Sequence, residues 1–205
     1  MRQQPLFFIV LFAVLLSGCT TLTLPPQNAH FDKQSWQKRQ TQLVQLKNWN
    51  IDGAFSVQQP SKSNIANYTW QQMGPNYRIQ INSSLNLYSL LIEGKSGSVT
   101  LQESKQKTTS ASSPEILMQQ RLGFSLPISN LAYWIRGLPA PTPYRSQRDA
   151  YGHLTELTQQ GWQVSFSHYA NVKQYDLPRT IKLVGHGLII KIATKNWNVS
   201  LRQSR

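Results

Sequence analysis

The sequence predicts a single, mainly β domain of about eleven antiparallel strands, curled or closed into a barrel, with a helical insert. Three observations support this fold class. Apolar and polar residues alternate with a period of two over residues 49–101 and again over residues 144–202. Residues 112–138 follow helical spacing instead. No long polar linker divides the chain, and a sheet of this many strands is expected to curl.

The N-terminal segment has the features of a bacterial lipoprotein signal. The apolar run from Leu6 to Leu16 is too short to span a hydrocarbon core about 30 Å thick. It ends in Leu16-Ser17-Gly18-Cys19, which resembles a lipobox. The resemblance implies that Cys19 is acylated and becomes the first residue of the mature chain.

These features define the expected domain organisation. We expect a lipoprotein signal peptide at residues 1–18, an acylated tether at residues 19–30 and one folded domain at residues 31–205. Thr20 stands where sorted lipoproteins kept in the inner membrane carry Asp. We therefore expect the chain to lie in the periplasmic leaflet of the outer membrane, held there by its acyl chains.

A helix from Asp32 to Asn48 is expected first, because Trp36, Leu43 and Val44 fall near one face. Five strands follow, and Asp52-Gly53 predicts a bulge in the first of them. The apolar residues that mark these strands are Trp49, Ile51, Phe55 and Val57; Ala66, Tyr68 and Trp70; Tyr77, Ile79 and Ile81; Tyr88, Leu90 and Ile92; and Val99 and Leu101.

Two helices are expected in the insert. Ser112-Ser113-Pro114-Glu115 predicts a capping box for a helix that ends before Gly123. A second helix begins near Ser129, with an apolar face of Leu131, Trp134, Ile135 and Leu138. Six strands complete the pattern: residues 144–148, 154–158, 162–169, 179–184, 188–194 and 197–202.

The composition offers few groups for catalysis. The chain has 8 carboxylates, 4 histidines and 1 cysteine, and the histidines lack metal-ligand spacing. Gly94-Lys95-Ser96 resembles the end of a phosphate-binding loop, but Ser89 stands where that motif needs its first glycine. We expect no catalytic residue, no metal and no cofactor, and we interpret the chain as a non-enzyme.

The net charge of +13 leaves the partner open. Such a charge is common in proteins that bind nucleic acid. An exported protein does not encounter cellular nucleic acid, so we expect no nucleic-acid partner. Anionic lipid headgroups, an acidic protein and general solubility stay as alternatives.

The 21 aromatic residues either fill a core or line a cavity for an apolar ligand, and periodicity does not separate these two cases.

Several motifs occur together in an order that is typical of one family. Trp134-Ile135-Arg136-Gly137-Leu138-Pro139 matches W-I-x-G-L-P, and Gly53-Ala54-Phe55 matches G-x-F. Further matches lie at residues 70–72, 77–78, 161–164, 177–178 and 192–197. On these residues the chain resembles the outer-membrane lipoprotein receptor family LolB, from the lipobox to the C-terminus.

The resemblance implies an incompletely closed, eleven-stranded antiparallel barrel with helices as a lid over an apolar cavity that houses acyl chains. It implies a receptor that accepts acylated lipoproteins from a LolA-type carrier protein and inserts them into outer-membrane lipid without nucleotide hydrolysis. We expect a monomer. The alternatives are a lipoprotein that binds another amphiphile, an envelope scaffold, and an envelope hydrolase with a polar cleft in a closed barrel.

The resemblance also assigns site residues. Leu85 falls where the family carries a leucine on a protruding loop that delivers lipoproteins to the membrane, although Ser84 and Asn86 replace the proline and glycine of the family. The expected cavity residues share the apolar parity of adjacent strands or the apolar side of the lid. They are Phe55, Tyr68, Trp70, Ile79, Ile81, Leu90, Ile92, Leu117, Trp134 and Ile135.

Overall fold

The computed structural model describes residues 33–83, 88–95, 97–104 and 108–199. The expected signal peptide, the tether with Cys19 and the loop residue Leu85 lie outside these residues. The helices are α1 (Lys33–Gln45), α2 (Pro114–Leu122) and α3 (Ile128–Trp134). The strands are β1 (Asn48–Gln58), β2 (Ser63–Met73), β3 (Asn76–Ser83), β4 (Ser89–Lys95), β5 (Ser98–Glu103), β6 (Thr109–Ala111), β7 (Tyr144–Arg148), β8 (Leu154–Gln159), β9 (Trp162–Val172), β10 (Tyr175–Gly185) and β11 (Leu188–Val199).

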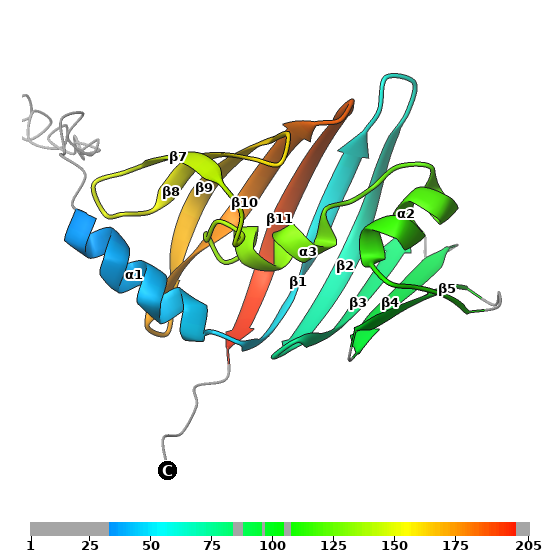
Figure 1. The fold of residues 1–205 in the computed structure, drawn as a ribbon, viewed down its shortest axis with the longest axis horizontal. Coiled ribbons are helices and arrows are strands. Elements are labelled where there is room, and N and C mark those ends of the chain that lie inside the picture. The colour runs from blue at the N-terminus through cyan, green and yellow to red at the C-terminus, as the bar shows by residue number, and fades with distance from the viewer. Residues whose placement is uncertain (1–32, 84–87, 96, 105–107, 200–205) are drawn as a thin grey trace, which may run out of the picture.

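All eleven strands form one antiparallel sheet in the order β6-β5-β4-β3-β2-β1-β11-β10-β9-β8-β7. The first and last strands of the sequence, β1 and β11, therefore pair in the middle of the sheet. Strands β6 and β7 are its two edges, and the sheet curls without closing (Figure 1). The expected incompletely closed barrel is confirmed.

The expected number of strands is correct only because two errors cancel. Strand β6 is a short polar segment with no apolar alternation, so the sequence pattern did not predict it. The two strands expected over residues 188–202 are one continuous strand, β11. Lys195 and Asn196 resemble a turn, but Asn196 pairs with Asp52 and Thr194 pairs with Gly53. Lys195 is therefore the extra residue of a β-bulge, and the expected bulge at Asp52-Gly53 is confirmed from the opposite strand.

The bulge depends on glycine. A Cβ atom built on Gly53 would lie 2.0 Å from the carbonyl oxygen of Ala193, so any side chain would push the two central strands apart. Asn196 donates hydrogen bonds from Nδ2 to both carboxylate oxygens of Asp52, at 3.1 and 3.0 Å. This contact ties the two strands together at the irregular point.

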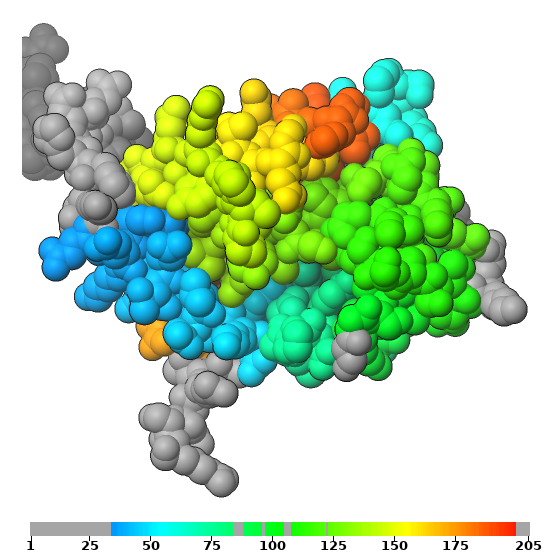
Figure 2. Space-filling model, in the orientation of Figure 1, coloured from blue at the N-terminus to red at the C-terminus, as the bar shows by residue number. Residues whose placement is uncertain are grey.

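We call residues 114–138 the lid. They connect the two edges of the sheet and lie across its concave face (Figures 1 and 2). Helix α2 is capped at its N-terminus by Ser113, whose Oγ accepts a hydrogen bond from the Ile116 amide, and at its C-terminus by Gly123, which has φ 76°. The N-cap is thus Ser113 and not Ser112, and Glu115 does not close a capping box. Its Oε1 accepts a hydrogen bond of 2.8 Å from the Ser129 amide, which joins the two lid helices.

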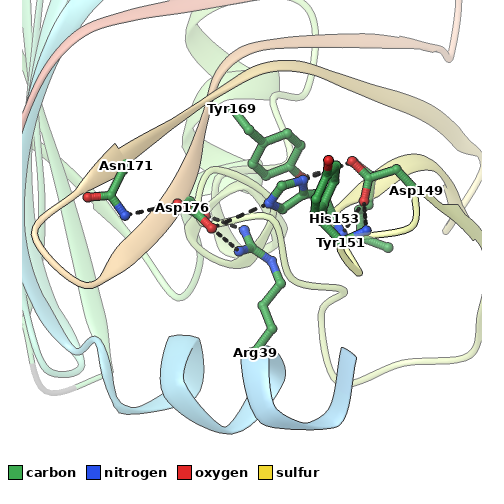
Figure 3. Close-up of polar contacts among 8 residues, drawn as sticks. Arg39, Asp149, Tyr151, His153, Tyr169, Asn171 and Asp176 are labelled. Carbon is green, nitrogen blue, oxygen red and sulfur yellow. Dashed lines mark hydrogen bonds and ion pairs between the residues drawn. The ribbon is translucent and has the colours of Figure 1, made fainter. Parts of the chain in front are cut away.

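Helix α1 is held against the other half of the sheet by a polar cluster (Figure 3). The guanidinium of Arg39 donates to the backbone oxygen of Asp176 and lies 5.2 Å from the centre of the Tyr169 ring. The His153 ring stacks on Tyr169 with centroids 4.2 Å apart, and its Nδ1 lies 2.8 Å from the Asp149 carboxylate. Burial lowers the pKa of Arg39 and raises the pKa of Tyr169.

Because of this cluster, we expect the free energy of unfolding to decrease slightly at acid pH. A hydrogen bond from Asn171, aided by His153 and Arg39, lowers the pKa of Asp176. Since the folded pKa lies below the unfolded value of about 3.9, the stabilisation is complete above that pH and is lost as the pH falls through the folded pKa.

We expect Asp176→Asn to reduce the free energy of unfolding at pH 7 by less than about 1 kcal/mol, because the side chain is 45% exposed. In urea unfolding, the difference in free energy of unfolding between this variant and the wild type should become smaller as the pH falls from about 5 to 3. Glu156→Gln, on the exposed side of β8, is the control for loss of one negative charge. A gap that stays constant with pH would contradict the prediction.

Candidate functional site

An apolar cavity lies between the lid and the concave face of the sheet. Its walls come from four neighbouring strands, β3, β2, β1 and β11, and from the lid. The lining residues are Phe55, Tyr68, Trp70, Ile79, Ile81, Leu126, Ile128, Leu131, Ile135, Ile190 and Ile192. Among the residues that the structure describes, none that lines this cavity is charged.

The alternation of the strands builds the floor of the cavity. Trp70 pairs with Ile79, and Tyr68 pairs with Ile81, across β2 and β3. Phe55 pairs with Ile192 across β1 and β11. Because successive side chains point to opposite faces, these residues share the concave face, and their strand neighbours face outward. Lid residues Ile128, Leu131 and Ile135 close the cavity from above.

The wall contains one buried polar pair. The hydroxyl of Tyr68 lies 3.0 Å from the hydroxyl of Thr194, so both groups are satisfied within the wall. Burial raises the pKa of Tyr68 to about 12. Tyr68 is therefore neutral at any physiological pH, and the cavity presents no charge to a ligand.

The cavity in this conformation is small, with a volume of about 50 Å³. Pockets that hold drug-sized ligands measure about 300–1,000 Å³. The expected space for acyl chains is therefore not open here, and its place is largely filled by the side chains of the lid and the sheet.

Six of the ten residues that the sequence assigned to the cavity do line it: Phe55, Tyr68, Trp70, Ile79, Ile81 and Ile135. The other four, Leu90, Ile92, Leu117 and Trp134, are buried in the core but do not line the cavity. Strand β4, with Leu90 and Ile92, lies next to β5, which α2 contacts directly. Both residues face the concave side of the sheet, as the alternation predicted, but packed side chains fill the space at this end of the sheet.

The sequence did not identify five lining residues. Ile190 and Ile192 carry the period-two signal of β11, and they line the cavity because β11 pairs with β1. Leu126, Ile128 and Leu131 belong to the lid. The spacing of Leu131 and Ile135 on one helical face was the available signal for this group.

The lid is anchored at Trp134, which is completely buried. Its indole Nε1 donates a hydrogen bond of 2.8 Å to Oε1 of Gln159 on β8. The same oxygen accepts from the Ala140 amide, and Nε2 of Gln159 donates to the backbone oxygens of Ala140 and Thr142, each at 2.9 Å. One buried amide thus attaches both the lid and the segment after it to the sheet.

Arg136 anchors the lid on its other side. Its Nη1 donates to the backbone oxygens of Leu43 and Leu46, at 3.2 and 2.9 Å, and its Nε donates to Ala132 at 2.9 Å. These oxygens belong to the end of α1 and to α3. Burial lowers the pKa of Arg136 to about 10, so the guanidinium stays charged at neutral pH. It links the lid to α1 and satisfies carbonyl groups at the helix end.

The Leu85 loop lies outside the described residues, between the ends of β3 and β4. Within the described part of the chain, no helix combines the length and the apolar character needed to cross a membrane.

Comparison with known proteins gives a consistent result. Residues 47–197 match the family model described as outer membrane lipoprotein LolB. The chain is 53% identical over 198 residues to an outer-membrane lipoprotein LolB of Coxiella burnetii, covering 96% of this chain and 94% of the relative. It is 37% identical over 194 residues to the protein of the same name from Pseudomonas paraeruginosa, covering 94% and 95%.

Solved structures support the fold. The crystal structure of a LolA superfamily protein from Nitrosomonas europaea matches with a TM-score of 0.55 at 10% identity, covering 84% of this chain and 95% of that one. A DUF1329 family protein from Desulfovibrio piger matches with a TM-score of 0.52, also at 10% identity, covering 84% and 94%.

Proposed function

The chain belongs to the outer-membrane lipoprotein LolB family, and on this premise we propose that it takes lipoproteins from a LolA-type carrier and inserts them into the outer membrane. As a member of the family it is an outer-membrane lipoprotein receptor with the LolA/LolB fold. We propose further that acylated Cys19 anchors it in the periplasmic leaflet, and that it acts as a monomer without catalysis or a cofactor.

The observation that carries this proposal is the uncharged cavity between the lid and the concave face of the sheet. A C16 acyl chain in water costs roughly 12 kcal/mol, at about 0.8 kcal/mol per CH2, so it cannot cross an aqueous space bare. We propose that the apolar walls from four strands and the lid shield the chain from water once the lid has moved away from the sheet. Lining residues Phe55, Tyr68, Trp70, Ile79, Ile81 and Ile135 are the proposed acyl-chain contacts.

We propose that the lid swings outward to admit the chain. The movement needs no external energy if the receptor binds acyl chains more tightly than the carrier, and the bilayer binds them more tightly still. Exchange of lid side chains for acyl chains against the same floor keeps the concave face covered throughout, so the apolar face is never left open to water.

A transfer experiment tests the proposal. The purified domain without Cys19 is mixed with a carrier loaded with a labelled lipoprotein, and the label is followed by gel filtration. The label should move to the receptor domain without nucleotide. Label that stays on the carrier contradicts the proposal. Binding of free fatty amphiphiles without exchange would instead favour a lipoprotein that handles another ligand, and binding of neither would favour a scaffold.

We expect the delivery step to depend on Leu85. Leu85→Glu should leave transfer from the carrier intact and reduce insertion of the labelled lipoprotein into liposomes by about tenfold, because a charged tip resists entry into hydrocarbon. Leu85→Ile is the matched control and should insert normally. Equal insertion by the glutamate variant and the wild type would remove Leu85 from the mechanism.

A further inference from the structure

A second hollow adjoins the cavity at one end of the sheet. This groove has a volume of about 520 Å³, roughly ten times that of the cavity by the same measure. It lies between the end of α1, helix α3 and the first three strands. It shares two lining residues, Trp70 and Ile128, with the cavity, so the two spaces are neighbours. We call it the aromatic groove.

A row of aromatic rings crosses four strands at this end of the concave face. The rings of Trp197 and Trp49 lie 5.5 Å apart, those of Trp49 and Trp70 lie 5.3 Å apart, and those of Trp70 and Tyr77 lie 6.4 Å apart. Trp49, Trp70 and Tyr77 line the groove together with Tyr133. Such rings offer an apolar body with a polar tip, a combination suited to the boundary between hydrocarbon and polar groups.

Three of the four tips have no hydrogen-bond partner among the described residues: that of Trp197, which does not line the groove, and two that belong to lining residues. The indole Nε1 of Trp49 and the hydroxyl of Tyr77 are buried and make no hydrogen bond there. Trp70 differs, because its Nε1 donates to Oε1 of Gln72 at 3.0 Å. A buried donor without an acceptor lowers the stability of the folded state, so such groups call for an explanation. Burial raises the pKa of Tyr77 to about 12, and its hydroxyl therefore keeps its proton as a donor.

We propose that the aromatic groove binds the ester carbonyls that join acyl chains to glycerol, with Trp49 and Tyr77 as hydrogen-bond donors. This inference rests on the proposed function, because it places the hydrocarbon in the adjoining cavity. The required ligand has an apolar part that continues past Trp70 and Ile128, and acceptor atoms without donors at its head. Acyl esters of glycerol have this chemistry. The cavity then takes the chain, and the groove fixes where the chain begins.

Two synthetic lipopeptides test the assignment on the domain without Cys19. One carries two C16 chains as glycerol esters, and the other carries chains of the same length as ethers, which lack the carbonyl oxygens. The wild type should bind the ester about tenfold to hundredfold more tightly. Tyr77→Phe, which removes only the hydroxyl, should lose part of this preference, and Trp49→Phe with Tyr77→Phe should lose all of it. Affinity for the ether should stay within about threefold throughout.

Tyr151→Phe is the control, because it removes a hydroxyl from an exposed ring that lies in the Asp149 to Asp176 cluster rather than in the groove. It should keep the full preference for the ester. Equal binding of ester and ether by the wild type would overturn the inference and leave the proposed function standing, as would a preference that survives in the double variant. Failure to bind either lipopeptide would instead overturn the proposed function.

A competition arm identifies the source of the ester. Soluble dihexanoylphosphatidylcholine should displace the ester lipopeptide much more weakly than unlabelled lipopeptide does, which assigns the groove to lipoproteins. Displacement at equal affinity that Trp49→Phe with Tyr77→Phe abolishes would support the same donors and assign the groove to glycerol esters in general.

Discussion

Glutamate in place of Ile81 is expected to reduce the affinity for an acylated lipoprotein about a hundredfold, which corresponds to about 2.7 kcal/mol. Ile81 lines the cavity between its strand neighbours Tyr68 and Leu90. It is only half-buried, so the carboxylate can reach water in the free protein, and the fold should survive. Once a hydrocarbon chain fills the cavity, the carboxylate must lose water or take up a proton, and both are costly.

Gln80→Glu is the matched control. It adds the same charge one residue away, on the exposed face of the same strand, and should bind like the wild type. The affinity of the Ile81→Glu variant should recover as the pH falls from about 7 to 5, because a carboxyl next to hydrocarbon has a raised pKa and is neutralised first. Fluorescence titration with a labelled lipopeptide measures both effects. Equal losses in the two variants would show that charge, not position, matters.

Alanine in place of Trp134 is expected to lower the free energy of unfolding by about 3–5 kcal/mol. The side chain is completely buried and is the contact through which the lid meets Gln159 on β8. Its loss leaves a large void and removes one of the hydrogen bonds that hold the lid. Because a typical domain is stable by about 5–15 kcal/mol, such a loss is a large fraction of the total.

Urea unfolding measures this effect, and Trp134→Phe should cost clearly less than alanine because it retains most of the buried area. Tyr151→Ala, at a ring that is 67% exposed, should change the free energy by less than about 0.5 kcal/mol. In the liposome insertion assay, the alanine variant should also lose its bound lipoprotein to liposomes faster, because the lid is less firmly attached. A stable alanine variant would contradict the anchoring role of Trp134.

Local pattern was enough to predict most strands, because alternation reports which side chains share a face. The bulge at Gly53 and the end of α2 before Gly123 were also predictable from residue type. Strand β6 was not predictable, since Thr109–Ala111 is only three residues long and shows no apolar alternation. The sequence pattern predicted two strands in place of β11 because a polar bulge and a polar turn look alike in sequence.

The cavity was predictable by parity but not by position. Ile79 and Ile92 carry the same signal, yet only the first lines the cavity, because the placement of α2 and α3 decides which part of the concave face is filled. Gln159 gave no signal at all, since an amide in a strand normally faces water. Its burial depends on acceptors and donors at Trp134, Ala140 and Thr142, which the fold brings to it from a distant part of the chain.

Because residue 49 pairs with residue 199 at the centre of the sheet, the sheet can be completed only after both ends of the domain have been synthesised. The strands from β1 to β6 and those from β7 to β10 can pair with their sequence neighbours during synthesis. The two groups are joined only when β11 has been made and pairs with both β1 and β10. A chain truncated before Leu188 would contain two separate sheets, each with an unpaired edge strand that is prone to aggregation. Only a chain that includes β11 can therefore complete the eleven-stranded sheet.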